Sequence, residues 1–224
     1  MTIWCLLTAD EDFQAFTPPP DFNNEWQTRL LYLSLDEVSD EGMHDLAYED
    51  QIKDFCTDCR CIICFENVAV KFRLAHFHFG NLNPHALPNT IRSLRLFACK
   101  QHYPLYTRSL PKDLRGIGLR QNRIYGRLDL TTLPPLLQLA NFRENELCGP
   151  IDLTKLPKDL QKLDLSSNSI RQHTVFYDSV PENLVIRLDG PNERRRIRNV
   201  VALNPNERRR DKRGFDLVTS KNMR

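Results

Sequence analysis

Residues 156–168 read LPKDLQKLDLSSN, and the same arrangement occurs three more times upstream at intervals of 23 residues. Each copy begins with a Leu-Pro pair, carries apolar residues at +4, +7 and +9, and has Asn, once Cys, at +12. Such a period predicts a repeat protein in which each unit packs on its neighbours. The four series are Leu87, Ile91, Leu94, Leu96 and Cys99; Leu110, Leu114, Ile117, Leu119 and Asn122; Leu133, Leu137, Ala140, Phe142 and Asn145; and Leu156, Leu160, Leu163, Leu165 and Asn168.

The spacing within each copy predicts a short strand followed by a bend. Side chains alternate between the two faces of a strand, so the residues at +7 and +9 point to the same buried side. The Asn at +12 turns inward where the strand ends, and its amide can donate to and accept from backbone groups that the bend leaves unpaired. Asp129 and Asp152 are expected to cap the backbone on the outer arc.

The pattern x-x-D-L-T-x-L-P-x-x-L-x-x-L-x-L-x-x-N, complete at residues 150–168, resembles that of leucine-rich-repeat proteins, above all the variants common in protozoa. The resemblance is specific over residues 87–168 and looser over about 26–190. It implies an α/β-type solenoid, a leucine-rich-repeat horseshoe of about six repeats. Short parallel strands would line its concave face and irregular or 3-10 turns its convex face. The resemblance also implies that the concave face binds another macromolecule and that the fold is not catalytic.

Weaker copies predict that the solenoid extends in both directions. We expect an N-terminal cap or acidic segment over 1–25, a solenoid over 26–190 that is most regular over 86–168, and a basic tail over 191–224. Residues 36–54 are acidic and fit either a helix or an elaborated repeat, and residues 180–188 fit a last strand. The weaker copies are Trp26, Leu30, Leu33, Leu35 and Val38, then Phe65, Ala69, Phe72 and Leu74.

The composition limits the class of protein. The chain has 224 residues, of which 41% are hydrophobic, and contains no apolar run long enough to cross a membrane. Its N-terminus lacks the basic region of a secretory signal. Seven Cys, an odd number, favour a reducing compartment, so we expect a cytoplasmic or nuclear protein. The net charge of +2 conceals an acidic N-terminal part and a basic C-terminal part.

The residues at +6, +8 and +10 point away from the core and predict the surface of the concave face. Basic residues dominate this face, and Gly116 and Gly118 leave a notch where a partner could approach the backbone. Acidic proteins and nucleic-acid backbones both select such surfaces, although an idle charged face is the alternative. The candidate partner-binding residues here are Lys71, Arg73, Arg95, Phe97, Arg120, Leu139, Arg143 and Lys162.

The C-terminal part repeats Pro-Asn-Glu-Arg-Arg-Arg at residues 191–196 and 205–210. One interpretation is a disordered basic tail or a nuclear-localisation-like patch. The other is an anchor that becomes ordered on RNA phosphates or on an acidic protein surface. The candidate binding residues of the tail are Arg194, Arg195, Arg196, Arg208, Arg209 and Arg210.

A cluster of Cys56, Cys59, Cys61 and Cys64 is the one group in the sequence with metal-binding character. Four thiolates could hold Zn²⁺, but structural zinc sites place a longer loop between their two pairs. The favoured hypothesis is therefore a buried strand from Cys61 to Cys64 in which Cys acts as a small hydrophobic residue, with no metal and no other cofactor.

The motif search favours a protein that is not an enzyme and has no small-molecule substrate. The sequence lacks G-x-S-x-G, H-E-x-x-H and a phosphate-binding glycine loop. We expect a non-catalytic protein–protein interaction scaffold, a small subunit of a larger intracellular assembly that docks through its basic concave face and Arg-rich tail. The alternatives are an RNA-contacting subunit of a ribonucleoprotein and a structural subunit associated with microtubules or the cytoskeleton.

Overall fold

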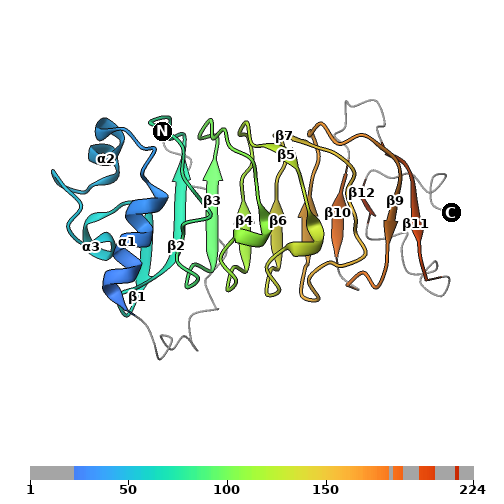
Figure 1. Cartoon of the computed structure of the whole chain (residues 1–224), viewed down its shortest axis with the longest axis horizontal. Coiled ribbons are helices and arrows are strands. Elements are labelled where there is room, and N and C mark those ends of the chain that lie inside the picture. Colours follow the sequence, from blue (N-terminus) through green and yellow to red (C-terminus); the bar gives the residue numbers. More distant parts are fainter. Residues whose placement is uncertain (1–22, 182–183, 189–196, 205–214, 217–224) are drawn as a thin grey trace.

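One long sheet runs along the whole molecule (Figure 1). The computed structural model describes residues 23–181, 184–188, 197–204 and 215–216. Eight strands pair in the order β1-β2-β3-β4-β6-β8-β10-β12, and every pair is parallel except β1–β2, which is antiparallel. The chain forms a parallel-strand β-solenoid of about five turns. The strands of this main sheet are Ile62–Phe65 (β1), Val68–Ala75 (β2), Ser93–Phe97 (β3), Gly116–Gly118 (β4), Leu139–Asn141 (β6), Lys162–Asp164 (β8), Val185–Arg187 (β10) and Phe215–Asp216 (β12).

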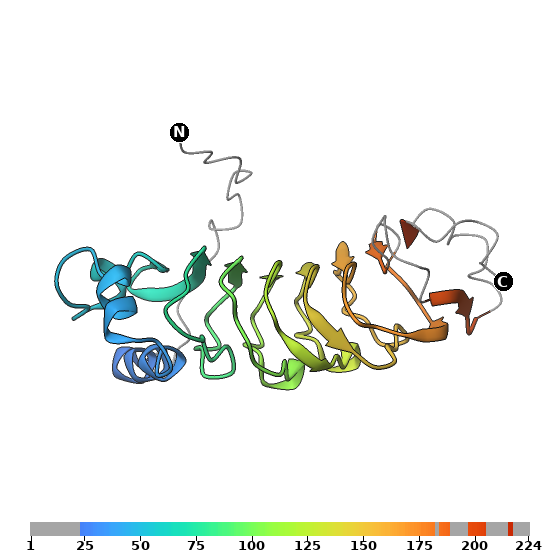
Figure 2. The same cartoon turned by 90° about the horizontal axis from the view of Figure 1, so that it is seen from above.

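Two smaller parallel sheets lie on the opposite side of the solenoid from the main sheet (Figure 2). Strand β5 (Tyr125–Arg127) pairs with β7 (Glu146–Cys148), and β9 (Gln172–Tyr177) pairs with β11 (Ile197–Ala202). Short 3-10 helices at Thr107–Ser109 and Leu130–Thr132 connect the layers. The expected caps are confirmed, because Asp129 accepts a hydrogen bond from the Thr131 N–H and Asp152 accepts one from the Thr154 N–H.

The core lies between the two layers and is made by the predicted apolar positions. Leu94, Ile117, Ala140 and Leu163 occupy one row of the main sheet, paired in register, and all four are buried. Burial of a Leu or Ile side chain contributes about 1.5–3 kcal/mol to the free energy of folding. Each turn is therefore stabilised by packing its apolar side chains against those of the next turn.

The Asn at +12 forms the predicted ladder. The Asn145 Oδ1 accepts from the Ile124 N–H at 3.1 Å, and its Nδ2 donates to Leu119 O at 2.7 Å and Phe142 O at 3.1 Å. Asn122 and Asn168 make the equivalent bonds in their own turns. The turn with Cys99 in place of the Asn uses Gln101 to bond the previous turn. The Gln101 side chain accepts a hydrogen bond from the Leu82 N–H and donates one to Gly80 O.

A left-handed residue precedes each of these positions and bends the chain out of the strand. The φ angles of Ala98, Gln121, Glu144 and Ser167 are 52°, 59°, 57° and 57°. A side chain in this conformation costs about 1–2 kcal/mol relative to the right-handed region. The repeat therefore combines a strained bend with an Asn whose hydrogen bonds compensate for it.

The N-terminal end of the solenoid is covered by three helices, α1 (Asn24–Ser34), α2 (Asp40–Leu46) and α3 (Phe55–Asp58) (Figure 1). The repeat expected from Trp26 to Val38 is therefore wrong. Its apolar residues also fit helical spacing: α1 buries Leu31, Leu35 is buried directly after it, and Trp26 and Leu33 stay 61% and 53% exposed. The alternatives for residues 36–54 resolve as a helix followed by a loop.

The region expected to be a basic tail contributes two strands to the solenoid. Strand β11 pairs with β9, and β12 pairs with β10, so the turn that begins at β10 is completed by residues beyond 190. No Leu-Pro pair precedes these two strands, which is why the sequence alone ended the solenoid too early. None of the helices in the described ranges is long and apolar enough to span a membrane.

Candidate interaction surface on the main sheet

The outward side chains of β2, β3, β4, β6, β8 and β10 form one continuous surface, here called the sheet face. They alternate along each strand with the buried positions of the core. Parallel register places them in two rows. The first row is Lys71, Ser93, Gly116, Leu139, Lys162 and Val185, and the second row is Arg73, Arg95, Gly118, Asn141, Asp164 and Arg187.

Arg120 and Arg143 follow β4 and β6 directly, at the edge of the sheet face. Both guanidinium groups approach the carboxylate of Glu144, with Arg143 Nε 2.7 Å and Arg120 Nη2 3.7 Å from Glu144 Oε1. Partial burial raises the pKa of Glu144, but hydrogen bonds from Gln121 and Arg143 and the charge of Arg120 outweigh burial and hold this pKa below its ordinary value. The Glu144 carboxylate therefore forms ion pairs with two of the predicted binding residues, Arg120 and Arg143.

Phe97 lies beside this ion-pair group. The Arg120 Cζ stands 5.7 Å from the centre of the Phe97 ring, a cation–π contact, and the His76 ring meets the same Phe97 edge-on at 5.2 Å. Such contacts contribute about 0.5–1 kcal/mol at exposed sites. They fix the orientation of a ring that is still 37% exposed.

A second acid neutralises the C-terminal end of the sheet face. Asp164 is buried, accepts hydrogen bonds from the N–H and hydroxyl of Ser166, and lies 3.8 Å from the guanidinium of Arg187. Sequence reasoning counted Asp164 as the only acid of the face and did not include Arg187. The signal for Arg187 was present in Val185-Ile-Arg187, which copies the outward–inward–outward order of the earlier strands.

Arg73 and Arg95 differ from the other cations. They are register partners on β2 and β3, both are exposed, and in the described part of the chain neither forms an ion pair. The structure therefore brings together all eight residues predicted for the sheet face but divides their charges into a paired and an unpaired group. The predicted tail residues Arg194, Arg195, Arg196, Arg208, Arg209 and Arg210 lie outside the described residues.

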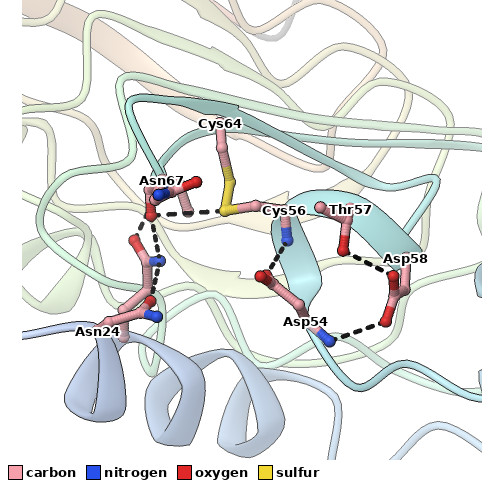
Figure 3. Close-up of a disulfide and its surroundings, with 9 residues drawn as sticks. Asn24, Asp54, Cys56, Thr57, Asp58, Cys64 and Asn67 are labelled. Atoms are coloured by element: carbon pink, nitrogen blue, oxygen red, sulfur yellow. Dashed lines mark hydrogen bonds between the residues drawn. A yellow bond between two sulfur atoms is a disulfide. The ribbon is translucent and has the colours of Figure 1, made fainter.

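The cysteine cluster lies in the N-terminal cap, away from the sheet face. Cys56 and Cys64 form a disulfide that joins α3 to β1 (Figure 3). The Asp54 carboxylate caps α3 at the Cys56 N–H, and Asp58 accepts from the Asp54 N–H. A disulfide sulfur is not a thiolate, so the four-thiolate zinc alternative does not fit the residues as they stand.

The other two cysteines are buried and touch each other. The Sγ atoms of Cys59 and Cys61 are 2.8 Å apart. The hydrogen bond from Cys61 holds the pKa of the Cys59 thiol below its ordinary value, whereas burial raises the pKa of Cys61. The predicted buried strand from Cys61 to Cys64 is confirmed only in part, because β1 begins at Ile62, Cys61 is buried directly before it, and Cys64 is half-buried and disulfide-bonded. The cytoplasmic or nuclear compartment expected from the cysteine count stays a prediction.

No family model matches the chain, and no curated protein matches it either.

Proposed function

We propose that the protein is a non-catalytic interaction scaffold of the leucine-rich-repeat type, and that it binds a protein partner through the sheet face. One observation carries this proposal: rows of outward side chains stand in register across six successive strands. Neighbouring strands are about 4.8 Å apart, so the face offers an extended array of contacts rather than an enclosed pocket. Solenoids use such faces for binding.

The physical argument for binding is the rigidity of the face. Each outward residue has a buried neighbour in the sequence, and Asn122, Asn145 and Asn168 hold the bends that follow β4, β6 and β8. A preorganised surface loses little conformational entropy on association. Cations and two exposed apolar side chains, Phe97 and Leu139, give it the mixture typical of protein interfaces.

The tail extends the proposal to a second contact. In the sequence, the two Arg-rich blocks at 191–196 and 205–210 directly precede β11 and closely follow it. We propose that they hold a neighbouring subunit of a multi-subunit assembly. Truncation at residue 190 would remove β11 and β12 with the arginines, so the tail is best tested by replacing Arg194, Arg195 and Arg196 with Ser.

Affinity purification of the full chain tests the proposed function. The sheet-face variant carries Arg73→Glu and Arg95→Glu, and a matched control carries Arg123→Glu and Arg171→Glu, two exposed arginines outside the rows of the sheet face. We expect the sheet-face variant to lose partners that the control keeps, and nuclease treatment to leave the recovered partners unchanged. Recovery of the same partners by both variants would remove the sheet face as the binding surface. Nuclease-sensitive recovery would favour RNA.

A further inference from the structure

Charge on the sheet face is divided between its two ends. Toward the C-terminus, Arg120 and Arg143 share Glu144, and Arg187 faces Asp164. Toward the N-terminus, Arg73 and Arg95 stand opposite each other in the β2–β3 pair, without an acid among the residues that the structure describes. Arg73 and Arg95 are therefore the two arginines of the sheet face whose charge no acid offsets among the described residues.

Two like charges opposite each other on adjacent strands are destabilising by up to about 1 kcal/mol. Binding of an anion between them reverses the sign of that interaction. Guanidinium groups bind carboxylates through two parallel N–H donors each. A carboxylate group between Arg73 and Arg95 is therefore a better fit than any neutral group.

A hollow without side chains adjoins this pair on β4. A Cβ placed on Gly116 would come no closer than 3.9 Å to Ser93 Oγ, and one on Gly118 would lie 3.7 Å from Arg95 Cγ. Both glycines have space above them, and the stem of Arg95 forms one wall. Leu139, which is 43% exposed, is the register partner of Gly116 on β6, and Phe97, which is 37% exposed, follows Arg95 by two residues on β3.

We propose that this arginine–glycine patch (Arg73, Arg95, Phe97, Gly116, Gly118 and Leu139) binds an extended acidic segment of a protein partner. The inference rests on the proposed function and names the chemistry of its partner. The midpoint of β2 and β3 lies one and a half strand spacings from β4, about 7 Å, and an extended chain covers that distance in two residues. The bound segment therefore carries Asp or Glu followed two positions later by an apolar residue.

The same observations argue against RNA as the ligand of the patch. Affinity for a nucleic acid depends on the number of phosphates that are neutralised, and only two unpaired arginines are available here. One further cation, Lys71, lies in the first row on β2, and the rest of the patch is formed by Phe97, Leu139 and two glycines. An acidic segment with an apolar residue uses both halves of the patch, whereas a phosphate backbone uses one.

Selection from a random peptide display library on the full chain tests the proposal. We expect enrichment of peptides with Asp or Glu at one position and Leu, Ile or Phe two positions later. A selected peptide should bind the Arg73→Gln/Arg95→Gln variant at least about tenfold more weakly, since loss of charge-assisted hydrogen bonds on this scale amounts to 1.4 kcal/mol or more. The Arg123→Gln/Arg171→Gln control should bind as the wild type does.

A second variant tests the hollow separately. Gly118→Val fills the space above β4 and suits a strand; the selected peptide should bind this variant less tightly and lose its apolar preference while keeping its acidic residue. Circular dichroism checks that each variant is folded. The proposal is overturned if selection shows no acidic residue, if both arginine variants bind equally, or if a 30-nucleotide oligouridine binds the patch with a steep salt dependence. If partner capture still requires the sheet face in that case, the proposed function survives the loss of this inference.

Discussion

The N-terminal cap, residues 24–65, and the repeats, residues 87–168, stabilise the same sheet by different means. In the repeats, a buried apolar row and a left-handed residue recur in every turn, and an Asn that bonds two turns recurs in three of the four. In the cap, each interaction occurs once, as in the disulfide and in Gln27, which bonds β2 from α1. The repeats are therefore redundant, whereas the cap depends on individual residues.

The difference leads to a thermodynamic expectation. In a solenoid, stability is approximately a sum of terms for each turn and for each interface between neighbours. A change in the cap should then unfold the cap alone, while a change within a turn should affect both neighbouring interfaces. The two Trp residues make this measurable: with Trp4→Phe, fluorescence reports on Trp26 in α1, and circular dichroism reports on the strands.

The largest effect is expected in the repeats. Phe142 is fully buried next to the Asn ladder, so Phe142→Ala should lower the free energy of unfolding by about 3–5 kcal/mol, because a cavity remains at an interface of two turns. Urea unfolding followed by circular dichroism measures this change. Phe176→Ala, on a strand but 46% exposed, is the control and should change stability by less than about 1 kcal/mol.

The next effect is expected in the cap. Cys64→Ser removes the disulfide to Cys56, which spans eight residues, and a loop of this size contributes about 2.5 kcal/mol. We expect the Trp26 fluorescence transition to move to lower urea while the circular dichroism transition stays in place. Cys148→Ser, at an exposed free thiol, should move neither. Equal shifts of both transitions would mean that the cap and the repeats unfold as one unit.

A smaller effect should follow from the joint between the cap and the sheet. Gln27 is buried, donates to Asn67 O at 3.0 Å and accepts from the Ala69 N–H at 2.7 Å. Gln27→Ala leaves both backbone groups without this partner and should cost about 1–3 kcal/mol. Gln51→Ala, an exposed residue in the same cap, is the control. Hydrogen exchange locates the change. In the Gln27→Ala variant, protection of the Ala69 amide against exchange should fall more than protection of the Ile124 amide.

The contrast between the regions also explains what the sequence alone could predict. The repeats were read correctly because the period, the apolar positions and the Asn ladder report the same structure several times. The error at Trp26 arose because spacings of four and seven residues occur both in the repeat pattern and in a helix, so a single copy could not distinguish them. Strands β11 and β12 were missed because no Leu-Pro pair precedes them.

For the candidate site, the sequence predicted which residues point outward but not which charges remain unpaired. Arg73, Arg95 and Arg120 are equivalent cations in the repeat pattern. Their difference depends on Glu144, which sits at the left-handed position of the bend and whose side chain returns to the sheet face. Pairing of this kind depends on side-chain direction after a bend, and periodicity carries no information about that direction. The sequence could not predict the disulfide pairing either, since one disulfide among the four cysteines of the cluster can form in six ways.

The smallest effect is expected at the bend after β8. It tests whether the left-handed conformation of Ser167 lowers the stability of the protein. Ser167 has a φ of 57°, whereas Ser169, two residues later, is exposed and is not left-handed. Glycine adopts positive φ without a steric penalty but loses more backbone entropy on folding. Ser167→Gly should therefore raise the free energy of unfolding by a few tenths of a kcal/mol, up to about 1 kcal/mol, while Ser169→Gly should lower it by about 0.5–1 kcal/mol. The pair is measured by urea unfolding under identical conditions. If both substitutions destabilise equally, the left-handed position carries no strain, and the hydrogen bonds of Asn168 have nothing to compensate for in that turn.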